Sequence, residues 1–200
     1  AGFILGFDGE RSGAGDRIHA FVAQTNIPQP LFGVLQALPT TALWNRLSPE
    51  DRLLAGRSYP VGDQNTLMNF VPTRPVTELA QEYVTGFWQM YEPQAYLRRC
   101  FQQCLNIRVS YHRRQTMQFP LHKSLPLFAQ LIWHQGIRRA EVRRQFWQQL
   151  WLIWWRKPAM LNMYLGLCAA GEHFWEYRVL ARERIQHQLT YDPLQPSSPQ

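Results

Sequence analysis

Cysteine is scarce in this chain of 200 residues, and the three cysteines are an odd number. Small disulfide-stabilised domains need many paired cysteines, so that class is excluded and a reducing compartment, the cytoplasm, is predicted. Long apolar runs are also missing. Residues 158–171 form an apolar, uncharged stretch that is shorter than the ~20 residues that a spanning helix needs. We therefore expect no transmembrane helix.

Several motifs that carry chemistry are absent as well. The six histidines form neither His-x3-His nor His-Glu-x2-His, so a zinc site is unsupported. Residues 13–15 (Gly-Ala-Gly) follow an apolar run, but neither Gly-x-Gly-x-x-Gly nor Gly-Lys-Ser/Thr is present. No Gly-x-Ser-x-Gly motif of a serine hydrolase occurs either. We predict no catalytic residue and no metal ligand in this chain.

Acidic residues are outnumbered, and the net charge is +7. Arginine supplies all but two of the 21 cations, and it clusters at residues 98–99, 108–114 and 138–144. We favour solvated helix faces for these clusters, with an anionic lipid or ligand as the second interpretation. No recognised nucleic-acid module accompanies them, so no nucleic-acid partner is predicted.

Two apolar runs without alternation stand near the start of the chain. Residues 3–7 and residues 31–35 each have the pattern of a strand in a parallel sheet, buried on both faces. Between them, Asp16 is a candidate N-cap for a helix that residues 26–28 (Asn-Ile-Pro) would stop. The arrangement predicts a βαβ crossover.

The second run leads into another helix. Gln36 breaks the apolar pattern, a loop passes through Pro39, and Thr40 or Thr41 can cap a helix. That helix should turn three apolar side chains inward, namely Leu43, Trp44 and Leu47. Ligands meet parallel sheets at the carboxyl ends of strands, so residues 36–39 lie where a cofactor would be bound.

At these residues the chain resembles the last two βα units of a radical S-adenosylmethionine (SAM) barrel. Residues 6–10 (Gly-Phe-Asp-Gly-Glu) and 39–41 (Pro-Thr-Thr) each depart at one position from the usual Gly-Phe-Pro-Gly-Glu and Pro-Gly-Thr. Further matches, including residues 69–72 (Asn-Phe-Val-Pro) and 172–174 (Glu-His-Phe), suit the cobalamin-binding branch that contains the hopanoid C-2 methylases. The expected fold is therefore an α/β fragment of a partial TIM barrel, followed by the mainly α-helical C-terminal domain of that branch.

The resemblance implies a cofactor site at the strand ends. Carried over by position, contacts to the adenosyl group of SAM fall on Gly6 and Phe7 and on Gln36, Ala37 and Leu38. Glycine lets the backbone approach a ring closely, and backbone amides beside apolar side chains suit adenine. The alternative is that Gly6 is only a strand-end turn and that Leu38 belongs to the core.

The resemblance also implies a reaction. The complete protein would use SAM, a [4Fe-4S] cluster and cobalamin to move a methyl group to an unactivated carbon of an apolar substrate, with a polycyclic lipid as the natural candidate. The ligands of the cluster and of cobalamin are not in this chain, so they would come from upstream segments, and the fragment alone would be inactive. The alternative is a non-enzymatic helical module that binds a protein partner or an anionic membrane surface.

We expect four regions along the chain. Residues 1–55 would be the end of the barrel, 56–76 a linker with a turn at 62–65, 77–190 the helical domain and 191–200 a disordered tail. The chain begins directly in an apolar run without Met or leader, so we expect a piece of a longer protein. In the helical domain, apolar residues keep helical spacing from Leu79 to Tyr91. The next helices should follow Pro93, stop before Gly136, cover 142–154 and begin at Leu161.

Two features of the helical domain admit a functional and a structural interpretation. Cys100 and Cys104 resemble part of a Cys-x3-Cys-x2-Cys cluster loop, but Ile107 stands at the third position, and we favour buried core thiols. Residues 145–155 carry four tryptophans next to Arg156 and Lys157, as an interfacial membrane anchor does. We favour core packing of that helix, with Trp154 inward, and leave peripheral membrane contact as the open alternative.

Overall fold

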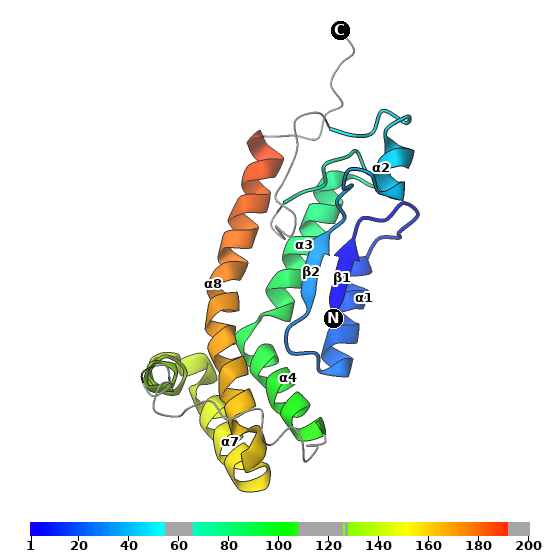
Figure 1. The fold of residues 1–200 in the computed structure, drawn as a ribbon. Helices are drawn as coiled ribbons and strands as arrows, with labels where there is room; N and C mark the ends of the chain where they lie inside the picture. The colour runs from blue at the N-terminus through cyan, green and yellow to red at the C-terminus, as the bar shows by residue number, and fades with distance from the viewer. Residues whose placement is uncertain (55–65, 108–125, 127, 192–200) are drawn as a thin grey trace. The chain divides into compact units, whose positions relative to one another are not determined.

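The computed structural model describes residues 1–54, 66–107, 126 and 128–191 (Figure 1). Its elements in chain order are β1 (Gly2–Leu5), α1 (Ala14–Thr25), β2 (Leu31–Val34), α2 (Ala42–Leu47), α3 (Val76–Met90), α4 (Pro93–Asn106), the π-helix η1 (Ile132–Arg138), α7 (Ala140–Arg156), the 3-10 helix η2 (Pro158–Met160) and α8 (Leu161–Tyr191). The described chain is thus mainly helical with one small sheet.

These residues form two compact units. The first, which we call the sheet unit, contains the described residues of 1–20, 30–88 and 178–191. The second, the helical unit, contains those of 21–29 and 89–177. The predicted turn at 62–65, the basic segment 108–114 and the tail 192–200 lie outside the described residues.

The sheet unit confirms the predicted βαβ arrangement. β1 and β2 pair in parallel, with Gly2 opposite Leu31 and Leu5 opposite Val34, and Figure 1 shows both strands pointing the same way. The prediction that both faces are buried is wrong. Leu5 is fully buried but Ile4 and Leu31 are exposed, because alternate side chains of a strand point to opposite faces whatever their polarity.

The predicted caps have different outcomes. Thr41 caps α2, and its hydroxyl accepts a hydrogen bond from the amide of Trp44 at 3.3 Å. Asp16 does not cap α1, which begins two residues earlier at Ala14. The carboxylate of Glu82 in α3 instead accepts the amides of Gly13 and Gly15, so a residue distant in sequence serves that helix end.

The core of the sheet unit lies under β2 and α2. Ala37, Leu47 and Phe70 are buried in one apolar cluster with Met68 and Leu79, and Leu43 and Trp44 pack against it as predicted. An isolated antiparallel β-bridge between Leu53 and Phe70 holds the segment that begins at residue 66. On β2, Phe32 stacks on Tyr83 of α3, with ring centroids 5.3 Å apart.

The predicted helical spacing in α3 is confirmed. About every fourth residue of α3 is buried, and Pro75 lies just before the helix. Glu92 caps α4 through the amides of Gln94 and Ala95. In the helical unit, Tyr91 stacks on Phe174 of α8 at 4.3 Å between ring centroids.

Two predictions for the helical unit are wrong. Gly136 does not end a helix but lies inside η1, where Trp147 of α7 packs so closely that an added Cβ would stand 2.9 Å from the indole. Trp154 does not point into the core and is 63% exposed. The buried residues of α7 are Val142, Phe146, Gln149 and Ile153.

Gly15 tests how tightly α1 packs on α3. A Cβ at this position would stand 2.9 Å from the backbone oxygen of Glu82, which cannot rotate away as a side chain can. We expect Gly15→Ala to lower the free energy of unfolding by about 1–3 kcal/mol, as overpacking does. Gly166→Ala in α8 is the control, because nothing lies within 4 Å of its Cβ position, and it should be neutral or stabilising. Equal urea midpoints for the two variants would contradict the close packing.

Candidate functional site

The loop after β1 is closed by its own residues. Gly6 and Gly9 have φ angles of +101° and +80°, which glycine adopts without strain. The amide of Gly6 donates to Glu10 Oε2 at 2.9 Å, and the amide of Glu10 donates to the carbonyl of Phe7 at 3.0 Å. Phe7 itself is 51% exposed. The loop therefore has a fixed backbone with one aromatic ring facing solvent.

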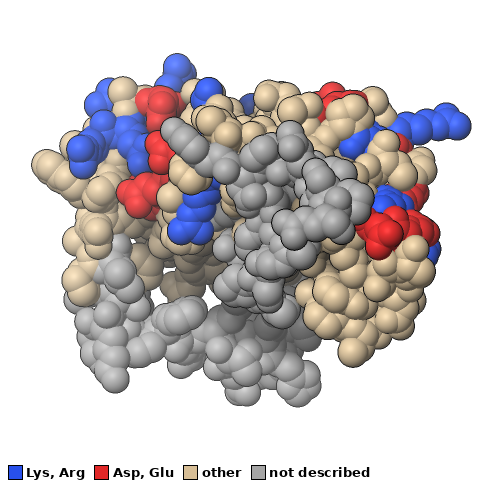
Figure 2. Space-filling view, turned by 90° about the horizontal axis from the view of Figure 1, so that it is seen from above, with Lys and Arg blue, Asp and Glu red and all other residues tan. Residues whose placement is uncertain are grey.

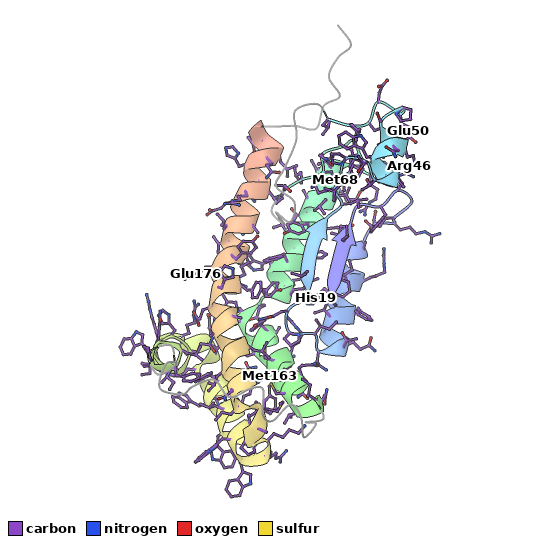
Figure 3. The ribbon with its side chains drawn as sticks, in the orientation of Figure 1. His19, Arg46, Glu50, Met68, Met163 and Glu176 are labelled. Carbon is purple, nitrogen blue, oxygen red and sulfur yellow. The ribbon has the colours of Figure 1, made fainter. Side chains whose placement is uncertain are left out.

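Gly6 is also needed for packing. A Cβ here would stand 1.9 Å from Cε of Met68, and Met68 belongs to the same buried cluster as Ala37. Figure 3 shows Met68 and Arg46 at the end of the sheet toward which both strands point. Of the predicted contacts, Ala37 thus lies in this buried cluster and Gly6 lies against its Met68.

The loop after β2 is held by a side chain that the sequence analysis did not assign to the site. Asn69 Oδ1 accepts from the amide of Ala37 at 2.8 Å, and Asn69 Nδ2 donates to the carbonyl of Ala37 at 2.7 Å. Gln36 Nε2 donates to the carbonyl of Leu67 at 2.7 Å. Leu38 is 40% exposed. Of the five predicted contacts, the side chains that face solvent are Phe7 and Leu38.

Asp8 of the first loop forms ion pairs with two arginines. Both of its oxygens accept from Arg52, at 2.8 and 3.0 Å, and Arg46 lies 2.7 Å away. The hydrogen bonds from Arg52 lower the pKa of Asp8 below its ordinary value of 3.8, against the opposing effect of burial. Ion pairs of Asp8 with Arg52 and Arg46 therefore fix this loop.

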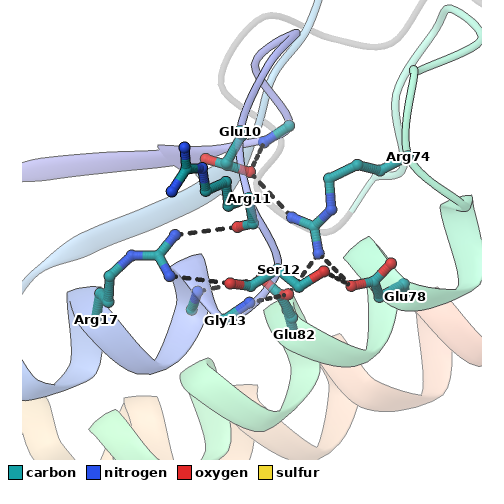
Figure 4. Close-up of polar contacts among 10 residues, drawn as sticks. Glu10, Arg11, Ser12, Gly13, Arg17, Arg74, Glu78 and Glu82 are labelled. Carbon is teal, nitrogen blue, oxygen red and sulfur yellow. Dashed lines mark hydrogen bonds and ion pairs between the residues drawn. The ribbon is translucent and has the colours of Figure 1, made fainter.

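A second charged cluster holds the start of α1 (Figure 4). Arg74 pairs with Glu82 at 2.5 Å, Glu78 at 2.6 Å and Glu10 at 3.5 Å. Burial alone would raise the pKa of Glu82, but hydrogen bonds from Arg74 and from the amides of Gly13 and Gly15 lower it. Those amides therefore have a carboxylate partner from the protein, at the end of the helix where a phosphate-binding loop would bind its ligand.

The positive charge of the sheet unit is largely balanced locally. Arg46, Arg52 and Arg74 each pair with at least one carboxylate. On the face seen in Figure 2, acidic side chains lie among the basic ones. Paired charges of this kind fix loops and contribute little long-range attraction for an anion.

The cysteines of the helical unit are core residues, as predicted. Cys100, Cys104 and Cys168 are all buried. Burial raises the pKa of Cys100 to about 12 and that of Cys104 to about 11, so both thiols are protonated at neutral pH. Thiolates bind iron and zinc, whereas protonated thiols do not. Within the described residues no group of His, Cys, Asp or Glu is arranged to hold a metal ion.

The helical unit has an apolar groove of about 420 Å³ along α7. Its described lining is apolar throughout and consists of Phe128, Ile132, Trp147, Leu150, Trp151, Trp154, Leu161 and Leu165. The sequence favours core packing of α7 with Trp154 inward and leaves peripheral membrane contact as the alternative. In the structure, Trp147, Trp151 and Trp154 line the groove and are exposed. No described helix has the length and apolarity to cross a membrane.

Asn69→Asp tests whether the paired hydrogen bonds fix the second loop. The substitution keeps the shape, but it replaces the donor to the Ala37 carbonyl with an acceptor and buries a charge. We expect a loss of about 2–3 kcal/mol in the free energy of unfolding. Asn45→Asp on the exposed side of α2 makes the same chemical change and should be nearly neutral. A small, equal effect in both urea titrations would show that the pairing does not matter.

Asp8→Asn tests the ion pair with Arg52 through pH. Because the folded-state pKa is lowered, the stabilisation is fully present above the unfolded value, near 3.8, and is lost as the pH falls through the folded value. The variant should be about 2 kcal/mol less stable at pH 7, and this difference should shrink below pH 3.8. Glu50→Gln, a more exposed partner of Arg52, should show a smaller difference. Thermal melts across pH give both values.

Two relatives of this chain are named as a methyltransferase and a methylase. An uncharacterized methyltransferase of Synechocystis sp., sll1242, is 45% identical over 189 residues, which is 94% of this chain and 35% of that protein. The hopanoid C-2 methylase of Rhodopseudomonas palustris is 28% identical over 152 residues, which is 74% of this chain and 27% of that protein. The chain therefore spans about a third of the length of the curated relatives it matches.

The family comparison covers most of the chain. A domain of unknown function, DUF4070, matches residues 41–187, which run from the cap of α2 to near the end of α8. No solved structure matches the chain. Because the match exceeds half of the chain, the protein belongs to the DUF4070 family.

Proposed function

We propose that this chain is the C-terminal part of a radical SAM enzyme, a cobalamin-dependent methyltransferase acting on an apolar substrate. Residues 1–55 would be the last two βα units of its barrel, and residues 77–190 its helical domain. The observation that carries the proposal is the parallel pair β1–β2 with a loop at the carboxyl end of each strand, the first loop containing glycines at positive φ. The relatives named as methyltransferases support it.

The residues at the strand ends fit a bound adenosyl group. Exposed Phe7 and Leu38 offer apolar surface for a purine. Gly6 lies buried beside Met68, with its amide bonded to Glu10. Gln36 and Ala37 provide polar groups beside them, although both are hydrogen-bonded within the protein. We propose all five as SAM contacts, with the largest contribution from Phe7 and Leu38.

The chemistry would come from cofactors, and this chain would position them. SAM, when bound, supplies the means to activate a carbon–hydrogen bond together with an iron–sulfur cluster. The described residues hold no metal-binding group, so ligands for the cluster and for cobalamin are assigned to other segments of the whole protein. The loops fixed by Asp8–Arg52 and by Asn69 would hold the apolar contacts in place and exclude water from them.

An apolar substrate is proposed from the groove in the helical unit. All of its described lining residues are apolar, and about 420 Å³ is large enough for part of a lipid. The name of one relative mentions a hopanoid, a polycyclic lipid. The proposed substrate class is therefore lipid-like, with a polycyclic lipid as the first candidate.

The test uses the full-length protein, purified without oxygen. Iron, sulfide and cobalt are measured first, and then the formation of 5'-deoxyadenosine from SAM with a reductant. About four iron atoms per chain together with deoxyadenosine would support the proposal, and bound cobalt would support the methyltransferase branch. A protein without iron and without SAM cleavage would contradict it.

Variants test the assigned contacts in the same protein. Phe7→Ala and Leu38→Ala should each weaken SAM binding about tenfold, because each removes a large apolar contact. Leu31→Ala is the matched control, since Leu31 is exposed on the same sheet but lies at the amino end of β2. Calorimetric titration with SAM gives the dissociation constants. Unchanged binding in both variants would remove the strand-end loops from the site.

The alternative is a helical module that binds a partner or a membrane surface without catalysis. A specific observation favours it, namely the exposed tryptophans of α7. Surface binding by these tryptophans does not by itself exclude catalysis, because the loops lie in the sheet unit and the tryptophans in the helical unit.

A further inference from the structure

The four tryptophans of α7 are exposed, although large aromatic side chains are normally buried in the hydrophobic core. Their exposed fractions are 44% for Trp147, 56% for Trp151, 63% for Trp154 and 74% for Trp155. Contiguous exposed apolar surface of this kind marks a binding face more often than an accident of packing. The buried side of α7 is supplied by other residues, so these rings are not needed for its core.

The spacing along α7 places cations and tryptophans on the same face. Arg143, Trp147, Trp151 and Trp155 stand four residues apart in series, which aligns them along one side of a helix. Trp151 and Trp155 stack at 6.4 Å between ring centroids, with their planes 10° apart. Arg144 lies seven residues before Trp151, on the same side. We call this surface the Trp face.

The Trp face is a rigid feature. Trp147 Nε1 donates to the carbonyl of Gly136 at 2.9 Å, and the ring packs against Gly136 itself. Trp147, Trp151 and Trp154 also form one wall of the apolar groove, so the groove opens on the Trp face. Whatever covers this face meets both the rings and the groove mouth.

The charge of α7 indicates what that partner is. Its cations Arg143, Arg144 and Arg156 are exposed, and Glu141 is its one acidic residue. Glu141 lies 3.7 Å from Arg139, which partly neutralises it. An anionic surface complements this pattern, with tryptophan rings at headgroup depth and arginines on phosphates.

We propose that the Trp face docks on the surface of an anionic lipid bilayer without crossing it. Lipid is favoured over a protein partner because four indoles and flanking arginines face outward from one helix, with no acidic residue among them to select a protein surface. Docking in this way would set the groove mouth against the bilayer, where an apolar substrate dissolves. The docking proposal stands on the exposed face alone and does not depend on methyltransferase activity.

Vesicle flotation of the full-length protein tests the proposal. The probes are phosphatidylcholine vesicles with and without phosphatidylglycerol, at low and high salt. We expect binding to the anionic vesicles, and we expect it to weaken as salt rises because the charge contribution is screened. Binding no stronger to anionic than to neutral vesicles would overturn the charge complementarity, and no binding at any salt would overturn docking altogether.

Two pairs of variants separate the rings from the charges. Arg143→Ala with Arg144→Ala should weaken binding to anionic vesicles about 30-fold, and Trp151→Ala with Trp155→Ala at least tenfold. Matched controls remove two exposed arginines, Arg98 and Arg184, or two exposed apolar residues, Val179 and Leu180, from other helices. Folded Trp variants that bind like the wild type would overturn the proposal.

Sedimentation velocity without vesicles checks the other occupants of the face. We expect the same sedimentation coefficient for the wild type and for the Trp151→Ala, Trp155→Ala variant, because we expect neither protein to self-associate through the Trp face. A wild-type dimer that the substitution dissociates would assign the face to a second copy of the chain and would overturn membrane docking. Because no activity is measured, failure here leaves the enzymatic proposal untouched.

Discussion

The sheet unit depends on the hydrogen bonds and the ion pair of the Glu82 carboxylate. This carboxylate reaches from α3 to the first amides of α1 and is itself held by Arg74. Gly15 allows α1 and α3 to approach so closely that a Cβ at this position would stand 2.9 Å from the backbone oxygen of Glu82. Because α1 follows the loop after β1, holding its first turn also holds the far end of that loop. The first loop of the candidate site is this one.

The two site loops are therefore stabilised by different means. The loop after β1 is closed by glycine geometry and an ion pair, and the loop after β2 is held by an asparagine side chain. Both arrangements are made by groups of the protein itself. A site built in this way is preorganised, which lowers the ordering cost of any molecule that binds there.

Local pattern was enough to predict most elements. The parallel strands, the Thr41 cap, the break at Pro93 and the buried cysteines depend on short-range signals, namely apolar runs, capping residues and helical spacing. Glu82 as the cap of α1 could not be found in this way, because it lies 67 residues from Gly15. The Asn-Phe-Val-Pro match did mark Asn69, but its partner is set by tertiary packing.

The prediction that Trp154 of α7 is buried was wrong for a different reason. Helical spacing shows that residues share a face, but it does not show which of two apolar faces is buried. In α7, Val142, Phe146 and Ile153 supply the buried face, and the indoles are left on the other. A helix that is apolar on two sides needs a second environment besides its own core, and sequence alone does not identify it.

The pairing of Asn69 with Ala37 has a further consequence. A carboxamide presents one acceptor and one donor side by side, as the N1 and N6 edge of adenine does. The backbone edge at the end of β2 is thus already occupied by an internal mimic of a purine. These two hydrogen bonds keep the edge in shape from within the protein, and any group that bonds to it on the same side must first displace the Asn69 carboxamide.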